Sequence, residues 1–365
     1  MHNHTQILSE LQYIFSACQH KIDARRIKFL AWLILALCQV QSVNFQKLAT
    51  HIAVHAQTSS NYRRIQRFMS SNSLPMMVVA KIIYACLGRK GGNILIMDRT
   101  NWKLGEQNIN ILMLAIKHNN VAYPLMFKLL NKRGNSNTCE RKALLNDYIQ
   151  WFGLDSIEHL LADREFVGKD WINYLENNNI SYVLRIRNNF KISKNGTRKF
   201  CVSQLLWGRT PDHIYHSQRK LLVVSNWCYI SVMNQKDDKG KNDAVILISN
   251  LKSKNRLDLY SHRWQIECLF KGLKSSGFQL EDTHVKEIEC LHTLISVTLL
   301  AFAWCYNIGE YVHQNIQKIK IKSHGRRAES VFKYGLKCLC RFLISGYQPK
   351  NLSNLDLFKR FLSCT

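Results

Sequence analysis

Polar residues recur between positions 260 and 274 in a pattern that could serve phosphate chemistry. They are Tyr260, Arg263, Glu267, Lys271 and Lys274. A helix turns by about 100° per residue, so these side chains would share one stripe about 80° wide. One carboxylate among three cations and a tyrosine could hold a metal ion against a phosphate backbone, if other parts of the chain supplied further ligands.

The same segment carries an apolar face that could fix it to a core. This face falls on an adjoining arc of about 100°. Its members are Leu259, Ile266, Leu269, Phe270 and Leu273. The segment is therefore predicted to be a helix that is anchored on one side and presents Glu267 on the other.

Two apolar strand patterns upstream each end in an aspartate, Asp98 in the first and Asp163 in the second. The last side chain of a strand can project over the edge of a sheet, and adjacent strands could bring two carboxylates together to bind divalent cations. A lone aspartate after a strand commonly caps the following turn, so this interpretation depends on the pair together with Glu267. Glu165, close to Asp163, is interpreted as a surface or helix-start acid rather than a metal ligand.

The elements that must position these acids follow from the hydrophobic periodicity. Strands are predicted at 93–98, 108–116, 121–127, 159–163 and 180–186, and helices at 138–152 and 169–177. The order β-β-β-α-β-α-β, with aspartates closing the first and fourth strands, is the skeleton of an RNase H-like domain. The predicted fold class is therefore α/β with an RNase H-like catalytic core.

Changes in pattern divide the chain into five segments. Residues 1–90 are predicted to be an N-terminal all-helical DNA-binding domain, followed by Gly91-Gly92 as a boundary. The core occupies 91–187 and resumes with the catalytic helix at 253–282. A β-rich insertion at 188–252 separates the two parts. Residues 283–365 are predicted to form a C-terminal helical region, including a basic helix over 324–344.

The charge of the chain points to a polyanionic partner. Its 51 Lys and Arg residues outnumber its 25 Asp and Glu residues, which gives a net charge of +26. The basic residues are spread along the whole length, which favours several contacts with nucleic acid over an anionic membrane. A basic protein without such a partner is the alternative.

Two apolar runs, 27–40 and 291–306, are interpreted as buried helices. The first is shorter than the about 20 residues that a membrane span needs, and the second contains polar residues. The twelve cysteines are scattered without a C-x-x-C pair, which argues against a zinc site. We therefore expect a cytoplasmic protein whose thiols are reduced and mostly buried.

Two short helices are predicted within the first 90 residues, at 44–55 with Asn44 or Ser42 as cap, and at 58–68. The second helix would turn its cationic side outward. Its cations are Arg63, Arg64 and Arg67. This pair resembles a helix-turn-helix or a looser DNA reader, with an ordinary basic surface helix as the alternative.

The motifs together resemble a known family. Four residues have the spacing of the Y-R-E-K signature of the IS-four family of bacterial DDE transposases: Tyr260, Arg263, Glu267 and Lys274. Asp98 in Met-Asp-Arg-Thr-Asn-Trp and Asp163 in Ala-Asp-Arg-Glu-Phe look like that family's two catalytic aspartates. The resemblance runs from about residue 44 to 345, without a departure at the catalytic positions.

The resemblance implies a cut-and-paste DNA transposase. Asp98, Asp163 and Glu267 would hold two Mg²⁺ ions, for which Mn²⁺ can substitute. One ion would activate a water or a 3′-hydroxyl, and the other would stabilise the leaving oxygen. The same site would nick DNA, form and open hairpin ends, and transfer strands.

DNA contacts are also implied by the resemblance. Tyr260, Arg263 and Lys274 would contact phosphates, and Trp264 and Lys271 would lie close to DNA. An aromatic residue of the insertion would stabilise a flipped base. For this role Trp227 is preferred to Trp207, although core packing is the favoured interpretation of both tryptophans.

The implied partners are double-stranded DNA, at inverted terminal repeats and at the target, and a second copy of the chain in a synaptic homodimer. No membrane partner is expected, and the location would be the bacterial cytoplasm, at the nucleoid. One alternative is an RNase H-fold endonuclease or resolvase without strand transfer. Another is a regulator that binds DNA ends without cutting, against which the complete set of three acids weighs.

Overall fold

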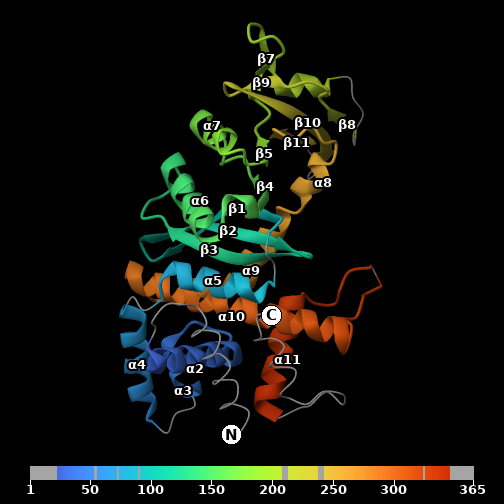
Figure 1. Cartoon of the computed structure of the whole chain (residues 1–365). Coiled ribbons are helices and arrows are strands. Elements are labelled where there is room, and N and C mark those ends of the chain that lie inside the picture. The colour runs from blue at the N-terminus through green and yellow to red at the C-terminus, as the bar shows by residue number, and fades with distance from the viewer. Residues whose placement is uncertain are drawn as a thin grey trace.

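The computed structural model describes residues 23–52, 56–71, 74–88, 91–207, 213–236, 242–323 and 325–345. A large sheet occupies the middle and top of the molecule as seen in Figure 1, and a layer of helices lies beneath it. The first 22 residues, which belong to the predicted N-terminal helical domain, lie outside the described residues.

The first five strands have the predicted order and kind of connection. Their sheet order is β3-β2-β1-β4-β5, antiparallel from β1 to β3 and parallel where β1 meets β4 and β4 meets β5. The strands are β1 (Asn93–Leu104), β2 (Gln107–His118), β3 (Val121–Leu129), β4 (Ile157–Ala162) and β5 (Tyr182–Ile186). This arrangement is compatible with an RNase H-like core.

Two helices lie between these strands, as predicted. Helix α6 (Thr138–Phe152) joins β3 to β4, and α7 (Lys169–Asn177) joins β4 to β5. The side chain of Asn137 accepts the backbone N–H of Glu140, whose carboxylate in turn accepts the N–H of Asn137. This capping box satisfies two donors at the helix start and explains why the helix begins where the sequence indicates.

The segment between β5 and the 260–274 region is rich in strands and extends the same sheet, because β11 pairs antiparallel with β5. Its strands are β6 (Lys191–Ser193), β7 (Lys199–Cys201), β8 (Ile214–His216), β9 (Leu221–Val223), β10 (Asn226–Lys236) and β11 (Asn242–Ser249).

Helices from both ends of the chain form the layer below the sheet (Figure 1). They are α2 (Ala24–Val40), α3 (Phe45–His51), α4 (Thr58–Ser70), α5 (Met76–Cys86), α10 (Ile288–Asn315) and α11 (Val331–Ser345). Asn44 caps α3, as predicted. The basic helix predicted from residue 324 begins only at Val331, because 325–330 form turns and a β-bridge between Ile321 and Arg327.

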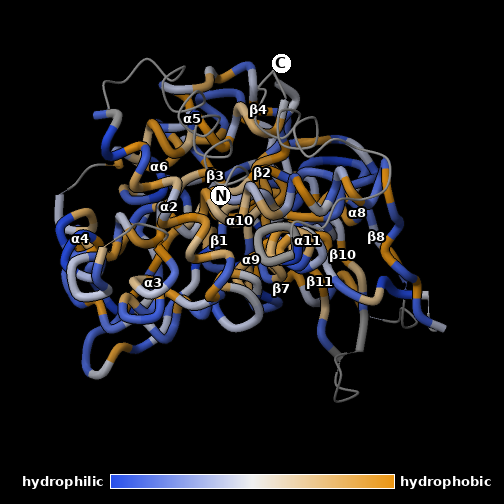
Figure 2. Tube along the Cα trace, turned by 90° about the horizontal axis from the view of Figure 1, so that it is seen from below, coloured by the Kyte–Doolittle hydropathy of each residue, from blue (hydrophilic) through white to orange (hydrophobic). Residues whose placement is uncertain are grey.

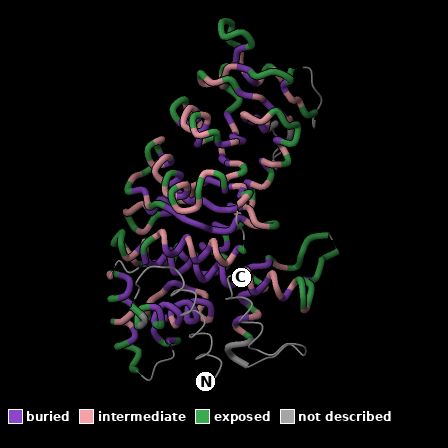
Figure 3. The backbone as a smooth tube through the Cα atoms, viewed as in Figure 1, coloured by how far each residue is buried: buried purple, intermediate pink, exposed green. Residues whose placement is uncertain are grey.

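Helix α10 is the centre of this layer. It packs against β3, α2, α4, α5 and α11. By length and composition it could cross a membrane, but 78% of its most apolar window is buried inside the protein, as expected for a core helix. Figure 3 shows the lower strands of the sheet, β1 to β3, and the helices directly beneath them as largely buried, and Figure 2 shows hydrophilic stretches toward the periphery.

The cysteines are less buried than predicted. Of the ten in the described residues, only Cys38, Cys228 and Cys305 are buried, while Cys139 and Cys268 are exposed. All ten are free thiols.

Candidate active site

Asp98 and Asp163 lie beside each other because of the register between β1 and β4. The strands are parallel, and Met97 pairs with Ala162, the last residue of β4. The residue that follows each of these two is an aspartate, Asp98 after Met97 and Asp163 after Ala162. Neighbouring strands lie about 4.8 Å apart and their paired residues point to the same face, so the two carboxylates start from adjacent positions.

The sequence predicted that the first strand ends at Asp98, but β1 does not end there. It continues to Leu104 through its pairing with β2, and Asp98 itself pairs with Met113. The strand that ends here is β4, so Asp98 is the point beyond which β1 has lost its parallel neighbour.

The 260–274 segment is two helices rather than one. Helix α8 (Arg256–Ser261) and α9 (Trp264–Lys274) are joined by a turn at positions 262 and 263. In this turn the Arg263 N–H donates to the Tyr260 carbonyl at 2.9 Å, an i to i+3 bond that winds the chain more tightly than an α-helix. The break places Arg263 at the start of α9.

The predicted apolar anchor of α9 is confirmed. Ile266, Leu269, Phe270 and Leu273 are buried, and α9 packs against β3 and β1. Leu259, also predicted for this face, lies on α8 and is only partly buried. Helix α9 thus packs chiefly on β3 and also contacts β1, the strand that carries Asp98.

The tyrosine and the arginine of this segment connect it to both aspartates. The Tyr260 hydroxyl donates to Asp163 Oδ1 at 3.0 Å. The Arg263 guanidinium lies between two acids, with Nη1 at 3.2 Å from Asp98 Oδ2 and Nη2 at 2.5 Å from Glu267 Oε1. Arg263 therefore links Asp98 on β1 to Glu267 on α9, and Tyr260 links α8 to Asp163 at the end of β4.

Burial sets the electrostatics of this site. It raises the pKa of the Asp98 carboxyl to about 7, and the neighbouring charges of Asp163 and Glu165 add to the rise, while the Arg99 N–H and Arg263 oppose it. The pKa of the Tyr260 hydroxyl is also raised, chiefly by burial, so this group is a hydrogen-bond donor at neutral pH. The ionised form of Asp98 is therefore disfavoured mainly by burial.

A divalent cation suits this set of donors. Carboxylate oxygens are the ligands that Mg²⁺ prefers, and a second cation would relieve the unfavourable ionisation of Asp98. Within the described part of the chain no three acidic, histidine or cysteine side chains converge on one point. Here the Arg263 guanidinium holds the place between Asp98 and Glu267, and its buried Nε has no hydrogen-bond partner.

Comparison with known protein families decides the relationship. The family model described as the transposase DDE domain matches residues 89–304, more than half of the chain. The chain belongs to the DDE transposases. The match spans the strands and helices that carry Asp98, Asp163 and Glu267. No curated protein matches this transposase.

Lys274 of this DDE transposase is held by the protein itself. Its Nζ lies 2.8 Å from Glu281 Oε1 and 3.2 Å from the Asn101 carbonyl, and it stands over the Trp102 ring at 5.2 Å. Trp264 and Lys271, by contrast, are exposed on the side of α9 that flanks Glu267.

The predicted burial of two tryptophans was wrong. Core packing was the favoured interpretation of Trp207 and Trp227, yet they are 72% and 45% exposed. Both belong to the strand-rich segment between β5 and β11, where short strands and turns leave little core to bury a large ring.

The arginines of α4 have different surroundings. Arg63 and Arg67 are exposed, whereas Arg64 lies over the Phe29 ring at 5.0 Å. Arg67 also lines a groove of about 730 Å³ between the start of α3, α4 and the segment before α10. Lys286 also lines that groove.

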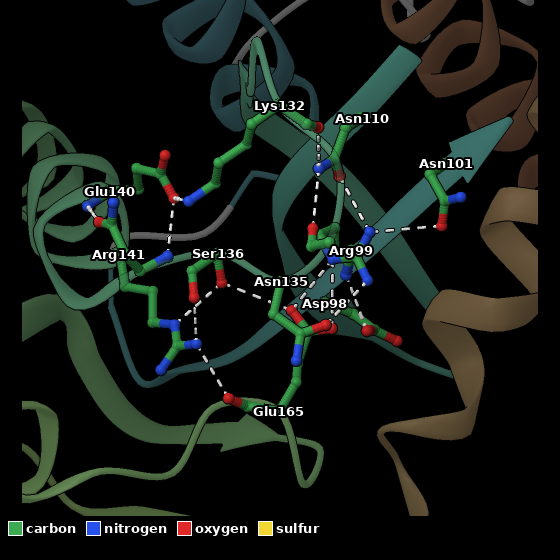
Figure 4. A network of polar contacts seen from close by, with 12 residues as sticks. Asp98, Arg99, Asn101, Asn110, Lys132, Asn135, Ser136, Glu140, Arg141 and Glu165 are labelled. Atoms are coloured by element: carbon green, nitrogen blue, oxygen red, sulfur yellow. Dashed lines mark hydrogen bonds and ion pairs between the residues drawn. The ribbon is translucent and has the colours of Figure 1, made fainter. Parts of the chain in front are cut away.

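Sequence reasoning missed Arg99 and misjudged Glu165. Their side chains form an ion pair at 3.2 Å and are mostly shielded from solvent, so Glu165 is no isolated surface acid. The available signal was positional: an arginine directly follows Asp98, and a glutamate follows Asp163 by two residues. Figure 4 shows this pair at the centre of a polar network.

Proposed function

We propose that this transposase belongs to the IS-four, Y-R-E-K group and performs cut-and-paste transposition. Asp98, Asp163 and Glu267 are its catalytic acids. The observation that carries the proposal is the pairing of β1 with β4, which brings two aspartates into register while Arg263 joins Asp98 to Glu267.

The three acids would hold two Mg²⁺ ions, with Mn²⁺ as a substitute. When bound, the ions would activate a water or 3′-hydroxyl and stabilise the leaving oxygen. The donor chemistry supports this assignment, because the acids are carboxylates, and Asp98 is buried next to another acid.

The chain's own residues would orient the acids and the scissile phosphate. Tyr260 fixes the rotation of the Asp163 carboxylate by donating to one of its oxygens. Arg263 presents a planar fork of donors, a geometry that suits a phosphate group. Lys274 would serve as a counter-charge for DNA after leaving Glu281.

The DNA partner is proposed to be duplex DNA, at inverted terminal repeats and at the target. Trp264 and Lys271 would meet the strand near the acids, and the arginines of α4 would grip the terminal repeat farther away. The net charge of +26 and the exposure of Arg63 and Arg67 support this path. Arg64 would contribute mainly by stabilising α4 against α2.

Further steps follow from the family resemblance. A synaptic homodimer would bring two ends together, hairpin ends would form and open at the same site, and the reactions would occur at the nucleoid in the bacterial cytoplasm. Trp227 is proposed to stabilise a flipped base, with Trp207 as the second choice, and their exposure supports a role at the surface.

One experiment separates the candidate activities. The full-length protein would be incubated with paired terminal-repeat DNA and Mg²⁺, with Asp98→Ala as control. We expect double-strand breaks and joined products from the wild type only. Nicks without joining would indicate an endonuclease, and a gel shift without cleavage would indicate a regulator.

A further inference from the structure

Arg99 joins the two strands that carry the aspartates. Its backbone N–H donates to Asp98 Oδ1 at 2.7 Å. Its side chain crosses to the turn that follows β4, where Nε lies 3.2 Å from Glu165 Oε2. One residue therefore contacts the first aspartate through its backbone and the turn of the second through its side chain.

The rest of the Arg99 guanidinium is also engaged. Nη1 donates to Asn110 at 3.0 Å and to Asn101 at 3.3 Å, and Nη2 donates to Asn135 at 3.3 Å. Asn110 is buried on β2. These contacts fix the plane of the guanidinium, so its direction toward Glu165 is set by several neighbours at once.

Glu165 is held from a second side by α6 (Figure 4). Arg141 Nη2 donates to the Glu165 carbonyl at 2.9 Å, and Arg141 Nε donates to the Ser136 hydroxyl at 2.9 Å. That hydroxyl lies 3.4 Å from the Glu165 carboxylate. Both the backbone and the side chain of Glu165 are thus clamped between β1 and α6.

The clamp acts on the turn that begins at Asp163. The Phe166 N–H donates to the Asp163 carbonyl at 2.9 Å, and the Phe166 ring is completely buried. Glu165 is the third residue of this turn. Fixing it therefore fixes the backbone from which the Asp163 side chain departs.

We propose that Arg99 and Glu165 are positioning residues that hold Asp98 and Asp163 at the separation needed to share a divalent cation. This inference rests on the proposed role of the two aspartates as metal ligands. Neither Arg99 nor Glu165 would touch the reacting atoms. They act as a brace between the strand that carries the first acid and the turn that carries the second.

The Arg99→Gln variant distinguishes a positioning role of Arg99 from a direct effect of its charge on cation binding. Removing a positive charge close to a cation site strengthens cation binding by Coulomb's law alone. Loss of the brace weakens it, and partners behind metal ligands commonly change metal affinity by about 10- to 100-fold. The two explanations thus predict opposite directions for one substitution.

The measurement is Mn²⁺ binding to the full-length protein without DNA, by electron paramagnetic resonance of the free ion. We expect Arg99→Gln to raise the Mn²⁺ dissociation constant by about tenfold. An unchanged or lower dissociation constant would overturn the proposal. Circular dichroism and thermal melting of each variant report whether the fold is retained.

A matched control comes from the same sheet. His118 at the end of β2 lies 3.0 Å from Glu310 on α10, and both side chains are mostly shielded from solvent. His118→Gln removes this contact away from the aspartates, and the Mn²⁺ dissociation constant should stay within about twofold of wild type. An equal loss in both variants would mean that general weakening of the sheet is responsible, and would overturn the positioning role.

Arg99→Lys covers the case in which Arg99→Gln does not fold. Lysine keeps the charge but cannot reproduce the fork that joins Glu165 to the three asparagines. Weaker Mn²⁺ binding at unchanged net charge supports the brace, and wild-type binding contradicts it. Asp98→Ala tests the underlying assignment: if that variant binds Mn²⁺ normally, the proposed metal site itself is wrong.

Discussion

The two halves of the candidate site are built in different ways. Asp98 and Asp163 are placed by backbone pairing, and the Arg99–Glu165 pair ties their strands together. Glu267 is placed by α9, which follows a tight turn and reaches the aspartates through the Arg263 side chain. The Asp98 side chain is 14% exposed, whereas that of Glu267 is 38% exposed.

This difference suggests a division of labour. Strand register changes only when a whole ladder of hydrogen bonds shifts, so the sheet half has a fixed geometry. The helix half depends on ion pairs that side-chain rotation can exchange for other partners. A site that must accept cations and a DNA strand would benefit from two different parts. We call Asp98, Asp163 and the Arg99–Glu165 pair the rigid half, and Arg263 and Glu267 the adjustable half.

The largest expected effect comes from breaking the rigid half. Asp98→Ala should reduce cleavage of terminal-repeat DNA by about 1000-fold or more, because a metal ion supplies several kcal/mol of transition-state stabilisation. Binding to the DNA ends should be largely intact, since the change removes a metal ligand and not a DNA contact. Cleavage gels and mobility shifts on the same samples measure both, and loss of end binding would contradict the division.

A smaller effect, of opposite sign to that of Arg99→Gln, is expected in the adjustable half. Arg263→Ala removes the guanidinium that stands between Asp98 and Glu267. Mn²⁺ should then bind about tenfold more tightly in the absence of DNA, because an internal competitor has gone. Cleavage should nevertheless fall, since Arg263 would also contact the scissile phosphate.

The pair of arginine variants sharpens the comparison. Titration of Mn²⁺ into both proteins should give weaker binding for Arg99→Gln and tighter binding for Arg263→Ala. His118→Gln serves as the common reference. If both variants moved the affinity in the same direction, the two halves would not differ in the proposed way.

The rigid half was the more predictable from sequence. Apolar strand patterns ending at Asp98 and Asp163, with a capped helix between them, are local signals, and parallel pairing follows from the β-α-β order. The apolar face of α9 was also visible as a helical repeat. These features depend on residues that are close together in the sequence, so a single sequence is enough to predict them.

The adjustable half was less predictable because its geometry depends on distant contacts. The turn before α9 places Arg263 against Asp98, which lies 165 residues earlier. The extension of β1 beyond Asp98 depends on pairing with β2, although the alternation of Arg99, Asn101 and Lys103 with less polar residues was a usable signal. Likewise, Trp207 and Trp227 are apolar in type, and only the fold decides that they are exposed.

The smallest predicted effect concerns Lys274, which the structure holds against Glu281 and the Trp102 ring. Lys274→Ala should weaken end binding several-fold and lower the slope of log affinity against log salt by about one, the value for one neutralised phosphate. Lys142, which lies over the Tyr174 ring away from the site, provides the control as Lys142→Ala. That variant should leave the slope unchanged.

Glu281→Gln tests whether Lys274 truly exchanges partners. The glutamate competes with phosphate for the same ammonium group, so its neutralisation should tighten end binding by a few-fold without changing the number of phosphates neutralised. The effect should disappear when Lys274→Ala is combined with it. An increase that persists in the double variant would arise from the loss of a negative charge near DNA. Lys274 would then belong to the rigid half of the site rather than to its adjustable half.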